Sequence, residues 1–186
     1  MKFTPQSIPE VILIEPIIHG DDRGYFIEAF RQDLFEESIG YKVNFVQDNE
    51  SRSSKGVLRG LHYQLSPYSQ AKLVRVIEGS VLDVVVDIRK SSSTFGQHIA
   101  LELSEQNKHQ LFVPHGFAHG FVVLSDKATF SYKVDNYYAP KHERGIVFSD
   151  KALAIDWRLP QEDLFLLDKD KNLPTLEQAL NIDKRL

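Results

Sequence analysis

The reactive side chains of this sequence gather in three stretches, and imidazole is prominent among them. His62 stands in a glycine-rich run, His115 and His119 share a second run beside a proline, and Tyr132 opens a tyrosine-rich third. Histidine transfers protons near neutral pH and also binds metals, and a tyrosine hydroxyl can donate a proton. These stretches therefore predict either acid–base catalysis or a metal site.

Strand periodicity decides which side chains of the first stretch can act together. A regular strand over residues 58–64 puts Leu58 and His62 on one face and Arg59 and Leu61 on the other. Two glycines lie in this stretch, and glycine permits a β-bulge. Arg59 and His62 are expected to share a face only if such a bulge interrupts the strand.

The metal hypothesis lacks a complete set of ligands. A histidine pair four positions apart is a zinc signature only on a helix, and the run 114–120, with one proline and two glycines, is not helical. No carboxylate follows His62 before Glu78, and the chain has no cysteine, which excludes thiolate ligands, disulfides and thiol nucleophiles. We therefore expect no metal site, and read an isolated histidine as an ordinary packed side chain unless its neighbours argue otherwise.

Composition limits the class of protein. The 186 residues are 42% hydrophobic with a formal net charge of −4, which suits one ordinary domain, residues 1–186, and argues against a broad basic face for nucleic acid. No apolar run reaches the roughly 18 residues that span a bilayer, and the first ten residues lack the layout of a signal peptide. We expect a cytoplasmic protein that binds neither nucleic acid nor membrane.

The elements that must position these side chains are mostly strands. Two apolar runs flank Glu78-Gly79-Ser80 and predict a hairpin. Helices are expected only near the ends of the chain. One spans residues 32–39 and ends at Gly40, and the other begins at a capping box formed by Thr175 and Gln178. Short strands at this spacing predict an all-β sandwich or small barrel. The expected strands are 74–77, 81–88, 98–103, 110–113, 120–124, 128–134 and 145–148.

Taken together, the sequence resembles the cupins, and within them the dTDP-4-dehydrorhamnose 3,5-epimerases. The resemblance extends over nearly the whole chain, and several long blocks in the same order carry it more specifically than the Pro-x-Gly-x-x-His element alone. These blocks are Gln47-Asp48-Asn49, Gly56-Val57-Leu58-Arg59-Gly60-Leu61-His62-Tyr63-Gln64, Gln70-Ala71-Lys72-Leu73-Val74, residues 112–121 and Leu166-Leu167-Asp168-Lys169-Asp170.

The resemblance implies a metal-free jelly-roll homodimer that exchanges protons beside a ketone, at C3 and C5 of a dTDP-4-keto-6-deoxyhexose, without a cofactor. By resemblance His62 is the base, Asp170 orients and stabilises its imidazole, and Tyr132 donates a proton from the opposite face. Lys72 is implied to be the cation beside the enolate oxygen, where a preorganised charge lowers the barrier.

The resemblance also implies a set of substrate contacts, part of which the partner subunit would supply to a shared nucleotide site. Arg23 and Arg59 would hold the pyrophosphate, because a guanidinium fork fits phosphate oxygens, and Phe26 and Tyr138 would flank the thymine. The other implied contacts are Glu28, Gln47, Asn49, His119, Glu143 and Lys169.

Three alternatives to this double epimerase stay open. Leu167, Asp135 and Phe148 depart from the residues common in the family, which leaves the reaction class intact but admits an enzyme that inverts only C3 or only C5. A metal-dependent cupin enzyme would use His62, His115 and His119. A cupin barrel that binds a nucleotide-sugar without turning it over is the third.

Overall fold

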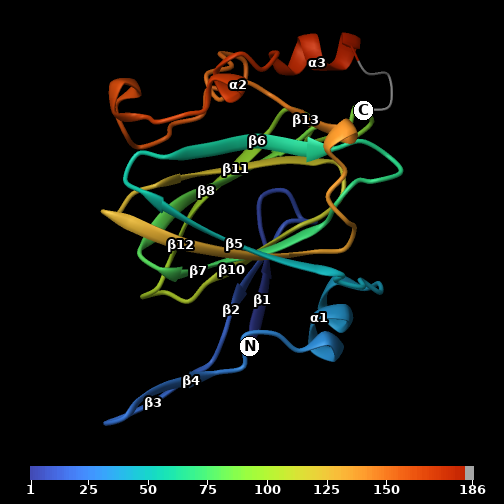
Figure 1. The fold of residues 1–186 in the computed structure, drawn as a ribbon. Coiled ribbons are helices and arrows are strands. Elements are labelled where there is room, and N and C mark those ends of the chain that lie inside the picture. The colour runs from blue at the N-terminus through green and yellow to red at the C-terminus, as the bar shows by residue number, and fades with distance from the viewer. Residues whose placement is uncertain (183–186) are drawn as a thin grey trace.

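In the computed structural model, which describes residues 1–182, two antiparallel sheets face each other (Figure 1). One has six strands in the order β1 (Lys2–Pro5), β2 (Ile12–Glu15), β10 (Gln110–Val113), β7 (Lys72–Glu78), β12 (Lys127–Val134) and β5 (Gln47–Ser54). The other has five, in the order β13 (Glu143–Gly145), β6 (Leu58–Gln64), β11 (Phe117–Val123), β8 (Ser80–Asp87) and β9 (His98–Ser104). The all-β sandwich predicted from the sequence is confirmed.

The strand β8 shows why the central run of the sequence is apolar without interruption. Val81 and Val85 point between the two sheets, whereas Leu82 and Val84 point to the outer face of the five-stranded sheet. Both faces are covered, so both sets of side chains are buried and successive residues can all be apolar. Gly79 makes the turn from β7 to β8 with a φ of 78°, as predicted, but the two strands do not pair. β7 belongs to the six-stranded sheet and β8 to the five-stranded sheet, so the predicted hairpin is wrong and the turn carries the chain from one sheet to the other.

The strand β6 carries an extra residue opposite β11. His119 pairs with His62, and the next pair is Phe121 with Arg59, so two residues of β6 separate partners that only one residue separates on β11. The sequence thus forms a β-bulge in its glycine-containing run, because glycine tolerates the local change of backbone direction.

The bulge changes which side chains of β6 share a face. Leu58 and Leu61 both pack into the apolar cluster outside the five-stranded sheet, although Leu58 also touches a pocket between the sheets, whereas Arg59 and His62 belong to no apolar cluster and both line that pocket. The regular alternation that paired Leu58 with His62 is therefore wrong, and the expectation that a bulge would bring Arg59 and His62 together is confirmed.

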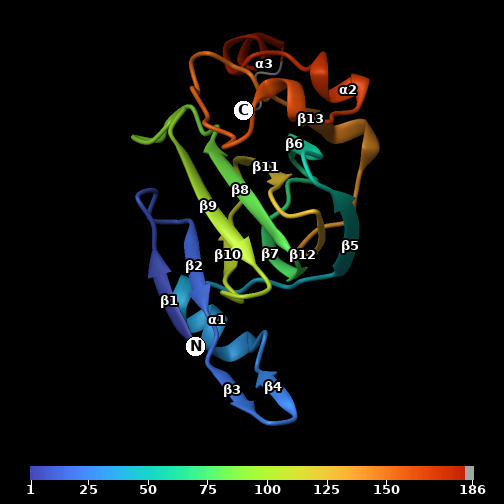
Figure 2. The same ribbon diagram turned by 90° about the vertical axis from the view of Figure 1, so that its left-hand side faces the viewer.

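The N-terminal third adds elements to the six-stranded sheet. The predicted helix, α1 (Gln32–Ile39), ends at Gly40 in the left-handed region and packs Phe35 edge-on against Phe112, with ring centroids 5.0 Å apart. β3 (Ile18–Asp21) and β4 (Gly24–Ile27) form a separate hairpin. Figures 1 and 2 show this hairpin projecting away from the two sheets, at the end opposite the C-terminal helices.

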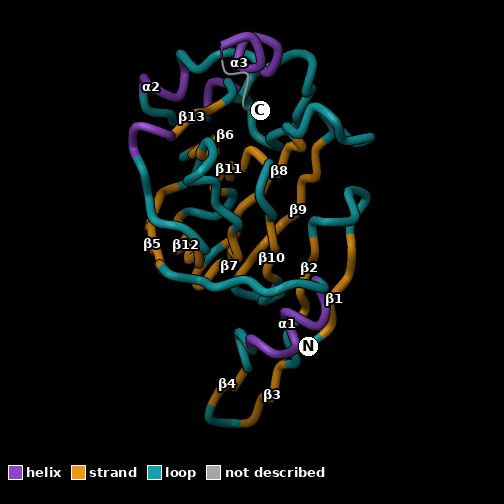
Figure 3. Tube along the Cα trace, turned by 90° about the vertical axis from the view of Figure 1, so that its right-hand side faces the viewer, coloured by secondary structure: helices purple, strands orange, loops and turns teal. Residues whose placement is uncertain are grey.

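The C-terminal segment covers the five-stranded sheet (Figure 3). Trp157 and Leu176 pack on its outer face, and the capping box forms, with Thr175 and Gln178 bonding each other's backbone N–H groups. Its elements are the short 3₁₀ helix η2 (Gln161–Asp163) and the helices α2 (Asp168–Lys171) and α3 (Leu176–Ile182), preceded by η1 (Pro140–His142) before β13. No helix within residues 1–182 is long and apolar enough to cross a membrane.

Some boundaries differ from those predicted. The strand expected over 120–124 begins three residues earlier, at Phe117, so His119 lies inside β11. The strand expected over 145–148 is replaced by β13 at 143–145. Strands β1 to β5 and helix α2 were not predicted. β3, β4 and β5 are mostly exposed and α2 has only four residues, so they give little apolar signal, whereas β2 is an apolar run with Ile12 and Ile14 buried and was missed despite that signal.

Candidate active site

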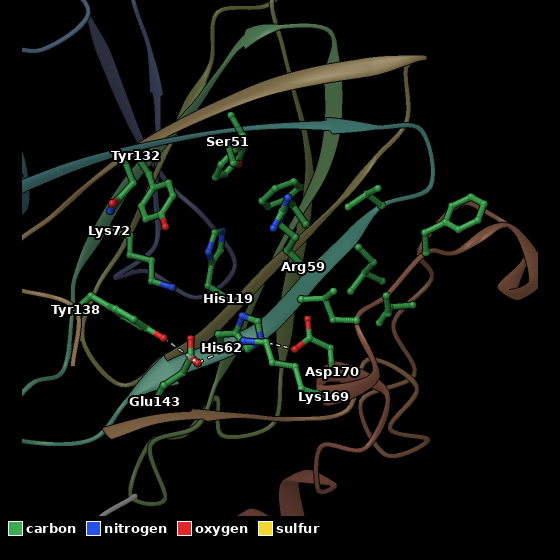
Figure 4. A pocket seen from close by; sticks show the side chains of 18 of the residues that line it. Ser51, Arg59, His62, Lys72, His119, Tyr132, Tyr138, Glu143, Lys169 and Asp170 are labelled. Carbon is green, nitrogen blue, oxygen red and sulfur yellow. Dashed lines mark hydrogen bonds and ion pairs between the residues drawn. The ribbon is translucent and has the colours of Figure 1, made fainter. Parts of the chain in front are cut away.

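A pocket of about 720 Å³ lies between the sheets, and most of the polar residues singled out in the sequence line it (Figure 4). Side chains reach it from β6 and β11 of one sheet, from β5, β7 and β12 of the other, and from α2 above. The predicted residues lining it are Gln47, Asn49, Arg59, His62, Lys72, His119, Tyr132, Tyr138, Glu143, Lys169 and Asp170.

His62 is held by a buried carboxylate. Its Nε2 lies 3.0 Å from Oδ1 of Asp170, which α2 brings over the end of the pocket, and the Asp170 side chain is only 4% exposed. An ionised carboxylate only accepts hydrogen bonds, so Nε2 carries the proton and Nδ1 is left with a free lone pair. Burial lowers the pKa of His62 below 6.5, although Asp170 acts in the opposite direction. At neutral pH His62 is therefore an uncharged imidazole that can accept a proton.

Tyr132 and Lys72 come from the wall opposite His62. Tyr132 lies on β12 and Lys72 on β7, both in the six-stranded sheet, whereas His62 lies in the five-stranded sheet, and Figure 4 shows the phenol and the imidazole on opposite sides of the pocket. Burial raises the pKa of Tyr132, which keeps its hydroxyl protonated, and burial lowers the pKa of the Lys72 ammonium to about 8. The site thus offers a base on one face and a proton donor with a cation on the other.

A second imidazole–carboxylate pair lies beside the first. His119 is the backbone neighbour of His62, and its Nε2 lies 2.9 and 3.0 Å from the two carboxylate oxygens of Asp83, which is fully buried on β8. The sequence analysis missed Asp83. A carboxylate within an apolar strand was the available signal, because a buried charge requires a partner.

Further charged and aromatic side chains line the pocket. Tyr138 donates a hydrogen bond to Glu143 over 3.2 Å, and Lys169 lies 3.5 Å from the same carboxylate oxygen. Gln47 bonds Asn49 over 2.8 Å, and the guanidinium of Arg59 bonds Ser53 over 3.2 Å. The pocket can therefore hold an anionic group at Arg59 and, on the opposite side in Figure 4, stack a flat ring on the exposed Tyr138.

Three predicted contacts do not reach the pocket of their own chain. Arg23 and Phe26 lie on the projecting hairpin, where the Arg23 side chain is 89% exposed and Phe26 is 64% exposed, and Glu28 follows β4 with a similarly exposed side chain. None of them lines the pocket. Their predicted role therefore requires a second molecule.

The three imidazoles of the metal hypothesis do not come together. His115 lines a different hollow of the surface and bonds Asp135 over 2.7 Å, whereas His62 and His119 line the pocket and are each occupied by a buried carboxylate. Across residues 1–182, no three His, Asp or Glu side chains are grouped so that they could hold a metal ion.

The family model described as dTDP-4-dehydrorhamnose 3,5-epimerase matches residues 5–178. The enzyme of that name from Shigella flexneri is 56% identical over 172 residues, which are 92% of this chain and 94% of the relative.

Solved structures agree with the sequence relatives. The dTDP-6-deoxy-D-glucose-3,5-epimerase of Legionella pneumophila, in complex with dTDP-4-keto-L-rhamnose, superposes with a TM-score of 0.91 at 50% identity, covering 95% of this chain and 93% of that one. A 3′-monoepimerase from Streptomyces bikiniensis, in complex with dTDP-quinovose, gives a TM-score of 0.89 at 35% identity, covering 96% and 89%. The cupin-like fold is thereby confirmed, and this chain belongs to the dTDP-4-dehydrorhamnose 3,5-epimerase family of isomerases.

Proposed function

We propose that this protein inverts C5 and C3 of dTDP-4-dehydro-6-deoxy-D-glucose to give dTDP-4-dehydro-L-rhamnose. The observation that carries the proposal is the placement of His62 with Asp170 on one wall of the pocket and of Tyr132 on the other. Inversion by proton exchange needs a base and an acid on opposite faces of the carbon, and this arrangement supplies both.

In the proposed reaction, Nδ1 of neutral His62 removes the proton from C5, and the electron pair of the C–H bond moves into the C4 carbonyl to form an enolate. The ammonium of Lys72 stabilises the negative charge on the C4 oxygen, in a site partly shielded from water. Tyr132 then protonates C5 from the other face. The imidazolium returns its proton to solvent, and the phenolate takes one back.

The same groups serve C3, which also lies beside the C4 ketone. Both carbons exchange one proton for another, so the reaction needs no oxidant or reductant. Asp170 supports the base twice, by holding its tautomer through the 3.0 Å bond and by stabilising the imidazolium that forms. The apparatus within one pocket is therefore sufficient for both inversions.

The nucleotide site is proposed to be shared between two chains. Arg23, Phe26 and Glu28 lie on or beside a hairpin that projects into solvent, and exposed Ile18 and Tyr25 lie on the same hairpin. Exposed apolar side chains of this kind favour an interface with another protein surface. We propose a homodimer in which this hairpin completes the partner's pocket, with Arg23 joining Arg59 at the pyrophosphate.

A single inversion is the second candidate. It is favoured by the likeness to the Streptomyces bikiniensis 3′-monoepimerase. The name of that enzyme indicates inversion at a single carbon, so this fold also occurs in a mono-epimerase. Nothing in the placement of His62 and Tyr132 restricts them to one of the two positions beside the ketone.

Proton NMR in heavy water tests both candidates. The protein is incubated with dTDP-4-dehydro-6-deoxy-D-glucose, and the signals of H3 and H5 are followed while deuterium replaces them. Loss of both signals with formation of the L-sugar supports the double epimerase, and loss of one alone identifies a mono-epimerase. Retention of both signals would contradict the proposed function.

A further inference from the structure

Two stacked phenylalanine rings line the pocket where it borders the apolar core. Phe121 comes from β11 and Phe130 from β12, so the contact joins the two sheets, with ring centroids 4.2 Å apart and planes 20° from parallel. They are 5% and 1% exposed, and both also belong to the apolar core between the sheets. They form a boundary between the pocket and the core, which we term the phenylalanine floor.

The phenylalanine floor adjoins the groups proposed to carry out the chemistry. The Phe130 ring lies 6.0 Å from the ring of Tyr132 and 6.2 Å from that of His119. Phe121 follows His119 by two positions on β11, and both face the pocket. A carbon held between His62 and Tyr132 therefore has this apolar surface next to it.

On the proposed function, that carbon is C5 of the sugar, and its one substituent without a hydrogen-bonding atom is the C6 methyl group. The ketone and hydroxyl groups are matched by Lys72, His119 and the other polar side chains of the pocket. We infer that Phe121 and Phe130 form the subsite for the C6 methyl group and select 6-deoxy sugars over their 6-hydroxy counterparts.

The chemistry of the two rings explains the selection. A methyl group gains from leaving water and contacting the rings, whereas a hydroxyl at C6 would lose its water without finding a donor or acceptor on either ring. The floor also suits inversion at C5, because the methyl group changes its position relative to the sugar ring during the reaction. Apolar contact is not directional, so both configurations can be accommodated.

A matched pair of stable ligands tests this inference, which rests on the proposed function but is measured separately from it. The sugars of dTDP-6-deoxy-D-glucose and dTDP-D-glucose differ only in the oxygen at C6, and neither has the ketone needed for turnover. We expect titration calorimetry to give tighter binding of the 6-deoxy ligand by about 10- to 100-fold, the range in which an apolar pocket rejects an added hydroxyl.

Three variants locate the selection. Phe121→Tyr adds a hydroxyl that can pair with the oxygen at C6, so the preference is expected to fall several-fold, whereas Phe121→Leu keeps an apolar surface and most of the preference. Phe165→Ala, at a 64% exposed residue of the pocket rim, should leave the ratio of the two affinities unchanged. Binding of dTDP alone reports whether each variant retains its nucleotide site.

The outcomes separate the inference from the proposed function. Equal affinities of the wild-type protein for the two ligands, with deuterium still entering at C5, would overturn the methyl subsite and leave the epimerase standing. A preference that disappears in Phe165→Ala and persists in Phe121→Tyr would overturn the assignment to the floor. Absence of deuterium exchange, with the 6-deoxy preference intact, would contradict the epimerase instead.

Discussion

Asp170 lies 3.0 Å from His62, although 108 positions separate the two in the chain. The link depends on the C-terminal segment, which covers the five-stranded sheet and passes over the pocket with the four-residue helix α2. The segment that shields the outer face of the sheet thus also delivers the carboxylate to the proposed base.

Replacing Asp170 by asparagine should impair proton abstraction by His62 without preventing substrate binding. We expect Asp170→Asn to lower kcat by about 100-fold or more, because an orienting carboxylate is part of a general base. Asp170 raises the pKa of His62, so its loss should also move the acid limb of the kcat profile to lower pH. Asp168→Asn, which removes a 92% exposed carboxylate from the same helix, is the control and should change neither quantity. An unmoved acid limb in Asp170→Asn would argue that the carboxylate serves only packing.

The pH dependence of the wild-type enzyme should be bell-shaped. Activity is expected to fall as the pH drops through the His62 pKa, which lies below 6.5, because a protonated imidazole cannot accept the substrate proton. It should fall again as the pH rises through about 8, because Lys72 then loses the charge that stabilises the enolate. Tyr132 has a raised pKa and stays protonated across this range.

The variant Lys72→Arg identifies the group behind the alkaline limb. Arginine keeps its charge at every pH in the range, so the fall near pH 8 should disappear, even though the changed shape of the side chain lowers the maximal rate. Measurements of kcat from pH 5 to 10 in both proteins make the comparison. A limb that persists unchanged in Lys72→Arg would assign it to another group.

Complementation tests the shared nucleotide site. Arg23→Ala and His62→Asn should each be nearly inactive, but co-expression should restore about a quarter of the wild-type activity, since half of the dimers are mixed and one of their two sites is intact. His62→Asn with Tyr132→Phe is the matched control, because both residues belong to one pocket and no mixed dimer has an intact site. Recovery in neither pair would place Arg23 outside the partner's site.

Two glycines allow a test of the fold. Both Gly40 and Gly79 have positive φ, but a Cβ at Gly40 would meet open space, whereas one at Gly79 would lie 2.0 Å from the carbonyl oxygen of Lys127. We expect Gly40→Ala to cost about 1 kcal/mol of unfolding free energy and Gly79→Ala roughly 2 to 4 kcal/mol. Urea denaturation followed by circular dichroism measures both. Equal losses would mean that the turn between β7 and β8 relaxes around the added methyl group.

Much of the fold could be predicted from periodicity and turn residues. α1 was predicted with its observed bounds because Gly40 ends it, and the two strands around the Gly79 turn were predicted from their apolar runs. Their pairing as a hairpin was wrong, because local sequence does not tell which sheet each strand joins. β5 could not be predicted: its sequence, Gln47 to Ser54, is polar throughout, and it is a strand because its backbone pairs with β12. Local sequence does not encode pairing of that kind.

The residues of the site were predicted through resemblance to the family. How the fold brings their side chains into one pocket was not predicted. Periodicity alone set Arg59 and His62 on opposite faces, and only the bulge in β6 brings both to the pocket. Asp83 and the phenylalanine floor were missed because an apolar strand and two aromatic residues with high β-propensity read as core packing.

The central claim is that His62 and Tyr132 act on opposite faces of the same carbon, and deuterium labelling of single variants tests it most directly. In heavy water, His62→Asn should lose exchange and inversion together, by about two to four decades. Tyr132→Phe should still take deuterium into C5 of the recovered substrate with its configuration retained, because the base is intact and the opposite acid is missing. Inverted, labelled product from either variant at the wild-type rate would contradict the assignment.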